Sequence, residues 1–119
     1  IQMGTRFISS IESPVHDNFK NSIKSAGTDG TYILNKSSKP VIRALKTELT
    51  KDIFEKGSMS MGDLAKIKDL YFGGDMNAAP ALAGQSSGLI NEIKSVKNII
   101  NETISEYNEV CLNLSKNLF

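Results

Sequence analysis

The residues best suited to chemistry stand at the start of the chain, in the run Ile1-Gln2-Met3-Gly4-Thr5. The first three are typical of the end of an apolar strand, and Gly4 lets the backbone turn without a Cβ in the way. Such a turn can bring backbone N–H groups close to an anion, and Thr5 adds a hydroxyl donor. The run predicts an anion-binding turn. The alternative is a tight turn without a ligand, since glycine is common in turns.

Other reactive side chains are few, because the chain contains one His and one Cys. These provide too few ligands for a His/Cys zinc site, so we expect no metal. Cys111 falls on an apolar helix face, where packing is the expected role. His16 lies beside Asp17 in an expected first helical turn, which favours capping or surface exposure over catalysis, because a general base needs a defined neighbour and a cleft.

Composition excludes several classes of function. The 119 residues suffice for one small domain, and 39% apolar with 23% charged residues is ordinary for a globular protein. A net charge of +1, without a basic run interleaved with aromatics, argues against nucleic-acid binding. No apolar run approaches the roughly 20 residues that span a bilayer. The single cysteine fits a reducing compartment, so we expect a cytoplasmic protein that binds no membrane.

The elements that must position these residues can be placed from periodicity. Phe7 and Ile8 are expected to continue the apolar segment. Ser13 followed by Pro14 predicts a helix start, and Gly27 predicts its end. One apolar face recurs every four residues in between: Val15, Phe19 and Ile23.

Two further elements flank a polar loop at residues 35–39. The β-branched and aromatic run Thr31–Leu34 predicts a short strand. Pro40 predicts the start of a second helix. The apolar stripe of that helix comprises Val41, Ile42, Leu45 and Leu49.

The second half of the chain is expected to be helical. A flexible link at 56–60 precedes a helix at 61–71, which Gly73 and Gly74 end. The neighbouring Met59 and Met61 are expected either to fill a core or to line a substrate pocket. From Ser95 onward, apolar residues at spacings of three and four predict one long helix. Its seam comprises Val96, Ile100, Thr103 or Ile104, Tyr107, Cys111, Leu114 and Leu118.

Four blocks, in order and spacing, resemble the nitronate monooxygenase family, formerly called 2-nitropropane dioxygenases, and the FMN-dependent enoyl-acyl-carrier-protein reductases that share its pattern. They are residues 2–7 (QMGTRF), 12–20 (ESPVH followed by FK), 40–46 (PVIRALK) and 83–90 (AGQSSGLI). Small side chains throughout residues 78–88 allow close approach of another backbone or of a flat ring.

The resemblance implies the C-terminal part of an FMN-binding TIM barrel, mainly α within this segment, because a complete barrel needs about 250 residues. Residues 1–9 would be the end of the last barrel strand and a phosphate loop. Residues 10–88 would form a small, mainly helical lid or substrate subdomain. Residues 89–119 would be the last barrel helix. Arg43, at a family position, is expected either to fix the second helix against neighbouring backbone or to be solvated.

For the site, the resemblance implies that Gln2, Met3, Gly4 and Thr5 hold the FMN phosphate, with Gly84 and Gln85 near the flavin. Catalytic residues are expected upstream of this segment, and none within it. The implied function is oxidation of alkyl nitronates with O₂. The alternative is FMN- and NAD(P)H-dependent enoyl-acyl-carrier-protein reduction. The substrate would be a small molecule or an acyl thioester, and the protein a homo-oligomer.

A third reading needs no flavin. The long C-terminal seam is also compatible with a stand-alone helical interaction or dimerisation module. An isolated barrel segment would expose the same seam. The barrel-segment and interaction-module interpretations therefore both predict self-association.

Overall fold

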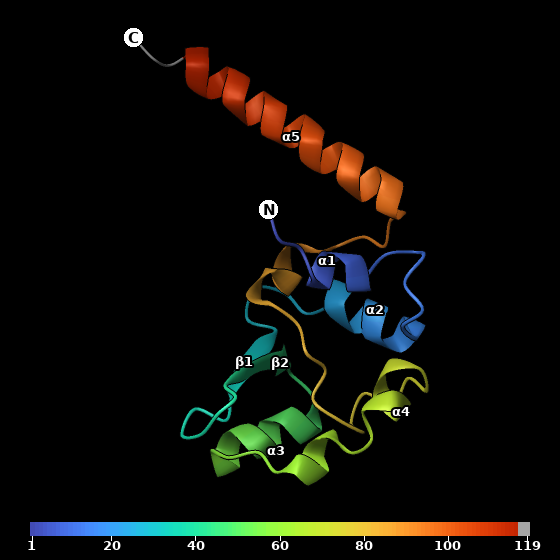
Figure 1. The fold of residues 1–119 in the computed structure, drawn as a ribbon, viewed down its shortest axis with the longest axis vertical. Coiled ribbons are helices and arrows are strands. Elements are labelled where there is room, and N and C mark those ends of the chain that lie inside the picture. Colours follow the sequence, from blue (N-terminus) through green and yellow to red (C-terminus); the bar gives the residue numbers. More distant parts are fainter. Residues whose placement is uncertain (117–119) are drawn as a thin grey trace.

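The structure, a computed structural model, describes residues 1–116 of the chain. The bounds of its elements are α1 Thr5–Ile8, α2 Asp17–Lys24, β1 Thr31–Leu34, β2 Ile42–Leu45, α3 Glu48–Lys56, the 3₁₀ helix η1 Met61–Leu64, α4 Ile67–Tyr71, the 3₁₀ helix η2 Gln85–Leu89 and α5 Val96–Lys116. Residues 1–95 form what we call the body, and α5 projects away from it (Figure 1). The mainly helical character expected from the sequence is confirmed.

The N-terminal segment departs from the extended run that its sequence suggests. Residues 1–3 have no regular structure, and Phe7 and Ile8 belong to α1, where both N–H groups donate to the Gly4 carbonyl at N···O distances of 2.9 and 3.1 Å. Phe7 and Ile8 therefore continue the apolar segment as a helical turn and not as part of a strand. A strand at residues 1–3 would need a partner strand that residues 1–116 do not supply.

The first predicted helix forms, but it begins at Asp17 rather than near Ser13. His16 is its N-cap: the ring Nδ1 accepts the Asn18 N–H at 3.1 Å. The His16 backbone N–H donates to the Tyr71 carbonyl at 2.7 Å, which fixes the chain just before the helix. Phe19 and Ile23 are fully buried, so the predicted apolar face is confirmed.

The largest error concerns the second predicted helix. Residues 42–45 are instead the strand β2, which pairs antiparallel with β1. Residues 81–83 extend this pairing, because the Leu45 N–H donates to the Ala81 carbonyl and the Ala83 N–H to the Arg43 carbonyl. Backbone partners on both sides outweigh a helical spacing of apolar residues. Arg43 therefore fixes no helix, and its Nη1 donates to the Thr31 hydroxyl at 2.8 Å.

Helical structure resumes with α3, where Thr47 and Thr50 form a reciprocal capping box and Gly57, at φ +75°, ends the helix. The helix predicted at 61–71 is split, because Lys66 leaves helical geometry between η1 and α4. Met61 is 85% exposed, whereas Met59 packs on the core around β1 and α3. Of the two roles expected for these methionines, Met59 therefore fills a core.

Two apolar clusters hold the body together. The larger joins α2, α4 and the small-residue segment, with its buried members Phe19, Ile23, Leu45, Leu70, Ala79, Ala81, Ala83 and Ile90. The smaller joins the sheet to α3 through Leu34, Ala44 and Ile53. Gly88 packs so closely that an added Cβ would lie 2.4 Å from the Gly27 carbonyl oxygen. Tight backbone packing therefore accounts for part of the small-residue block.

The predicted C-terminal helix is confirmed as α5, and Figure 1 shows it leaving the body after its first turns. Within its described residues only Ile99 is buried. The seam residues Ile100, Ile104, Tyr107 and Leu114 are 43–62% exposed, and Leu118 lies outside the described residues. None of the described helices combines the length and apolar character needed to cross a bilayer.

Candidate anion-binding site

The predicted anion-binding turn meets the small-residue segment. Thr5 opens α1 and is 9% exposed, and its hydroxyl oxygen accepts the N–H of Gly84 at 2.8 Å. These residues are 79 positions apart in the sequence. Packing of α1 against η2 brings them together, so two of the four blocks that carry the family resemblance form one site.

A cavity of about 700 Å³ opens beside this contact. Five of the six predicted cofactor-binding residues line it. Gln85, the sixth, is exposed at the start of η2 and lies outside the lining. The lining consists of Gln2, Met3, Gly4, Thr5, Arg6, Gly84, Ser86, Leu89, Ile90, Asn91, Lys94, Ile99, Glu102, Thr103 and Glu106.

The turn presents hydrogen-bond donors that the chain does not use. Within residues 1–116 the N–H groups of Gly4, Thr5 and Arg6 donate to no protein acceptor. The Thr5 hydroxyl accepts from Gly84, and its own proton has no acceptor in the same residues. Gly4 has φ −101°, and a Cβ added there would meet no atom within 4 Å. Neither backbone conformation nor internal packing therefore requires a glycine at this position.

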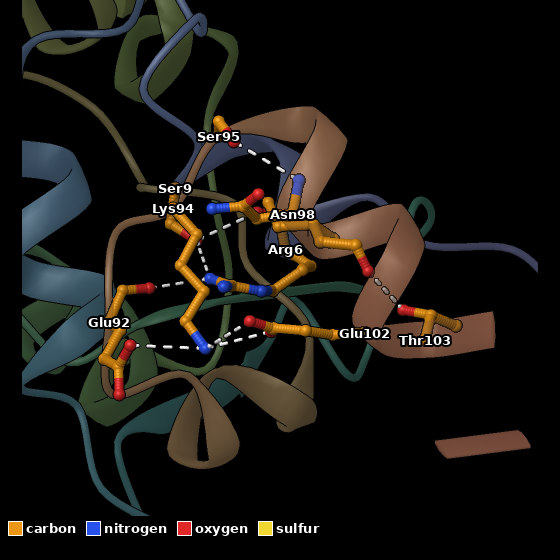
Figure 2. A network of polar contacts seen from close by, with 9 residues as sticks. Arg6, Ser9, Glu92, Lys94, Ser95, Asn98, Glu102 and Thr103 are labelled. Carbon is orange, nitrogen blue, oxygen red and sulfur yellow. Dashed lines mark hydrogen bonds and ion pairs between the residues drawn. The ribbon is translucent and has the colours of Figure 1, made fainter. Parts of the chain in front are cut away.

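The lining of the cavity also carries balanced charges. Figure 2 shows the Lys94 ammonium between two carboxylates, 2.9 Å from Glu102 and 3.2 Å from Glu92. These hydrogen bonds, the one to Glu102 above all, raise the pKa of Lys94 above its ordinary value. Arg6 and Lys94 balance Glu102 and Glu106 in formal charge. Any anion held here would therefore depend on directed donors rather than on net positive charge.

Local sequence patterns did not indicate Arg6, Lys94 or Glu102 as members of the site. All three are polar residues outside any apolar period, and only the position of Arg6 beside Thr5 hinted at its place. His16 caps α2, Cys111 lies exposed on α5, and neither lines this cavity. The described residues contain no cluster of three metal-ligating side chains.

Comparison with known proteins identifies the fold around this site. Residues 1–106 match the protein family described as nitronate monooxygenase. This chain belongs to that family. The resemblance inferred from the four sequence blocks is thereby confirmed, and the family is one of oxidoreductases.

Two solved structures extend the match. FabK from Thermotoga maritima is 31% identical, with a TM-score of 0.87 over 98% of this chain and 39% of its own. A single-residue mutant of FabK from the same organism is 35% identical, with a TM-score of 0.83 over 98% of this chain and 37% of its own. The chain thus spans well under half the length of the proteins that it matches.

Proposed function

We propose that this chain is the C-terminal part of a longer FMN-dependent oxidoreductase and supplies one of its two phosphate-binding loops. The observation that carries the proposal is the convergence of Gly4, Thr5 and Gly84 on one cavity, where the N–H groups of Gly4 and Thr5 donate to no acceptor within residues 1–116. In TIM-barrel enzymes the phosphate site is commonly built from the loops after strands seven and eight. Residues 1–9 fit the second of these loops.

The donor set suits a phosphate group. The Thr5 hydroxyl keeps its orientation through the Gly84 N–H and can donate its proton outward. The N–H groups of Gly4 and Thr5 add two further donors, and the missing Cβ at Gly4 lets an anion approach the backbone. Bound FMN would supply the electron transfer, while the protein groups bind and orient it. Gln2 and Met3 would line its approach, and Gln85 would have to turn toward the cavity to contact it.

Two reactions fit the family. The first is oxidation of alkyl nitronates with O₂, which follows from the family itself. The second is NAD(P)H-dependent reduction of an enoyl thioester. It is favoured by the FabK structures, since FabK is the enoyl-acyl-carrier-protein reductase of this family. No residue of this chain is assigned a catalytic role, and the base or acid of either reaction is expected in the preceding part of the longer protein.

The test is a pair of assays on the longer polypeptide purified with its flavin. One follows NAD(P)H oxidation with a short enoyl thioester, and the other follows O₂ uptake with an alkyl nitronate. Activity in one assay assigns the reaction. A flavin-loaded protein inactive in both would refute both candidates, and a colourless, self-associating native protein of this length would instead support the interaction module.

A further inference from the structure

Thr5 and Arg6, which are adjacent in sequence, form hydrogen bonds with the two ends of one segment, residues 84–92. Thr5 accepts the N–H of Gly84 at 2.8 Å, and Arg6 Nη1 donates to the carbonyl of Glu92 at 2.7 Å. The 3₁₀ helix η2 lies between these two contacts. Thr5, Arg6 and residues 84–92 are therefore joined in one closed ring of backbone and side chains, and Thr5, Arg6 and Gly84 of this ring line the cavity.

The guanidinium of Arg6 is directed at protein groups. Its Nη1 also donates to the hydroxyl of the fully buried Ser9 at 3.3 Å, and the Ser9 hydroxyl donates in turn to the Arg6 carbonyl at 3.0 Å. Figure 2 shows this group beside Ser9 and Glu92, close to the Lys94 network. Side chain and carbonyl of one residue are thus both fixed.

Helix α1 cannot hold this geometry alone. It has four residues, and a helix this short has too few internal hydrogen bonds to offset its own nucleation. The chain after it is tied to the same neighbour, because the Ile11 N–H donates to the Lys94 carbonyl at 3.0 Å and the Glu12 carboxylate accepts the Val96 N–H at 2.9 Å. Of these hydrogen bonds, the one made by Arg6 lies next to Thr5 in the sequence.

We propose that Arg6 is a positioning residue for the phosphate loop. It holds α1 against the Glu92 carbonyl so that the Gly4 and Thr5 donors point into the cavity, and it does not itself bind the ligand. This inference rests on the proposed function. It also explains why an arginine is suited to this position, since a guanidinium can donate along fixed directions to two acceptors, whereas an ammonium is a point charge.

The test compares the affinities of the longer polypeptide for FMN and for riboflavin, which lacks the phosphate. Arg6→Met should weaken FMN binding about tenfold, as expected for loss of a charge-assisted hydrogen bond, and leave riboflavin binding unchanged. Arg6→Lys should not restore FMN affinity. The matched control is Arg43→Met, which removes the hydrogen bond to Thr31 away from the cavity and should leave the FMN-to-riboflavin affinity ratio unchanged.

Two results would overturn the inference. One is an FMN-to-riboflavin affinity ratio that Arg6→Met leaves unchanged, whether both affinities stay the same or fall equally. The other is full recovery of FMN affinity in Arg6→Lys, which would indicate direct contact through charge. If the unaltered protein bound FMN and riboflavin equally, the phosphate site itself would be refuted. If Arg6→Met retained no flavin, amide hydrogen exchange in the flavin-free protein would test whether Arg6 positions the loop. The Gly84 N–H should exchange faster in Arg6→Met than in Arg43→Met, and equal rates would contradict the inference.

Discussion

The body and α5 are built from similar apolar side chains, but only the body buries them. Phe19, Ile23 and Leu70 are 0% exposed in the larger cluster, whereas Ile104 and Tyr107 on α5 are 55% and 61% exposed. The body therefore has its own core. The α5 seam has the period of a buried helix face, but residues 1–116 provide no surface that covers it, which is consistent with a chain spanning 37–39% of its structural matches.

The attachment of α5 differs in kind as well. Its first turns bury one apolar side chain, Ile99, and are otherwise held by polar contacts. These contacts are the Ser95 cap, the Glu12 carboxylate on the Val96 N–H, and the Lys94–Glu102 ion pair. These same turns form one wall of the cavity through Glu102, Thr103 and Glu106. The site thus lies at the junction between a self-contained unit and an element that depends on a partner surface.

The sharpest way to break this comparison is a matched pair of isoleucine truncations. Ile23→Ala should lower the free energy of unfolding by about 2–5 kcal/mol, because it leaves a cavity in a closed core. Ile104→Ala should change it by less than about 0.5 kcal/mol, because the side chain is already solvated. Chemical denaturation of both variants measures this, and equal losses would show that α5 is as well packed as the body.

Self-association tests the other half of the comparison. The 119-residue chain should form oligomers at tens of micromolar through the α5 seam, since this would cover its apolar surface. Replacing two seam residues, Ile100→Glu with Ile104→Glu, should yield a monomer that keeps the fold of the body. Sedimentation velocity distinguishes the species. A monomeric unaltered chain would contradict self-association through the α5 seam.

A smaller effect is expected at the junction. The Ser95 hydroxyl accepts the Asn98 N–H at 3.2 Å, so Ser95→Ala should cost about 1 kcal/mol of α5 stability, as loss of an N-cap does. Hydrogen exchange should accelerate in the first turn of α5 and stay unchanged in α2. Uniform acceleration in both helices would instead show that α5 and the body unfold as one unit.

The smallest expected effect is an alkaline loss of stability. Burial raises the pKa of Tyr71 above its ordinary 10.0. The unfolded phenol therefore ionises first, and stability should fall as pH rises above 10. The pKa of Lys94 is also raised above its ordinary 10.5. The stability that its ion pair contributes is therefore fully present below pH 10.5 and is lost as the pH rises through the folded-state pKa. Tyr71→Phe should remove the first contribution and keep the second, as measured by denaturation across pH 9–11.5.

Local patterns sufficed wherever one element determined its own structure. The strand at Thr31–Leu34 follows from its β-branched and aromatic residue types, and the apolar face of α2 and the whole described length of α5 follow from side-chain spacing. Residues 42–45 could not be predicted in this way, because their strand is stabilised by β1 and by residues 81–83, neither of which is visible in a local period.

The residues of the candidate site likewise fall into those that the sequence predicted and those that it did not. Gly4, Thr5 and Gly84 were expected through the family resemblance, and the structure places all three on one cavity. Arg6 and Lys94 were missed, because Arg6 contacts a carbonyl 86 positions away and Lys94 contacts a carboxylate on a different element, Glu102 of α5. Polar contacts between distant segments leave no spacing signal, whereas apolar faces do.

The most direct measurement is a crystal structure of the longer polypeptide with FMN bound. We predict a phosphate oxygen within about 2.5–3.0 Å of the Thr5 hydroxyl oxygen, the usual range for an O–H···O hydrogen bond, with the Gly4 N–H donating to the same phosphate. A flavin phosphate bound elsewhere, with the Gly4–Thr5 turn facing only solvent or protein, would contradict the account.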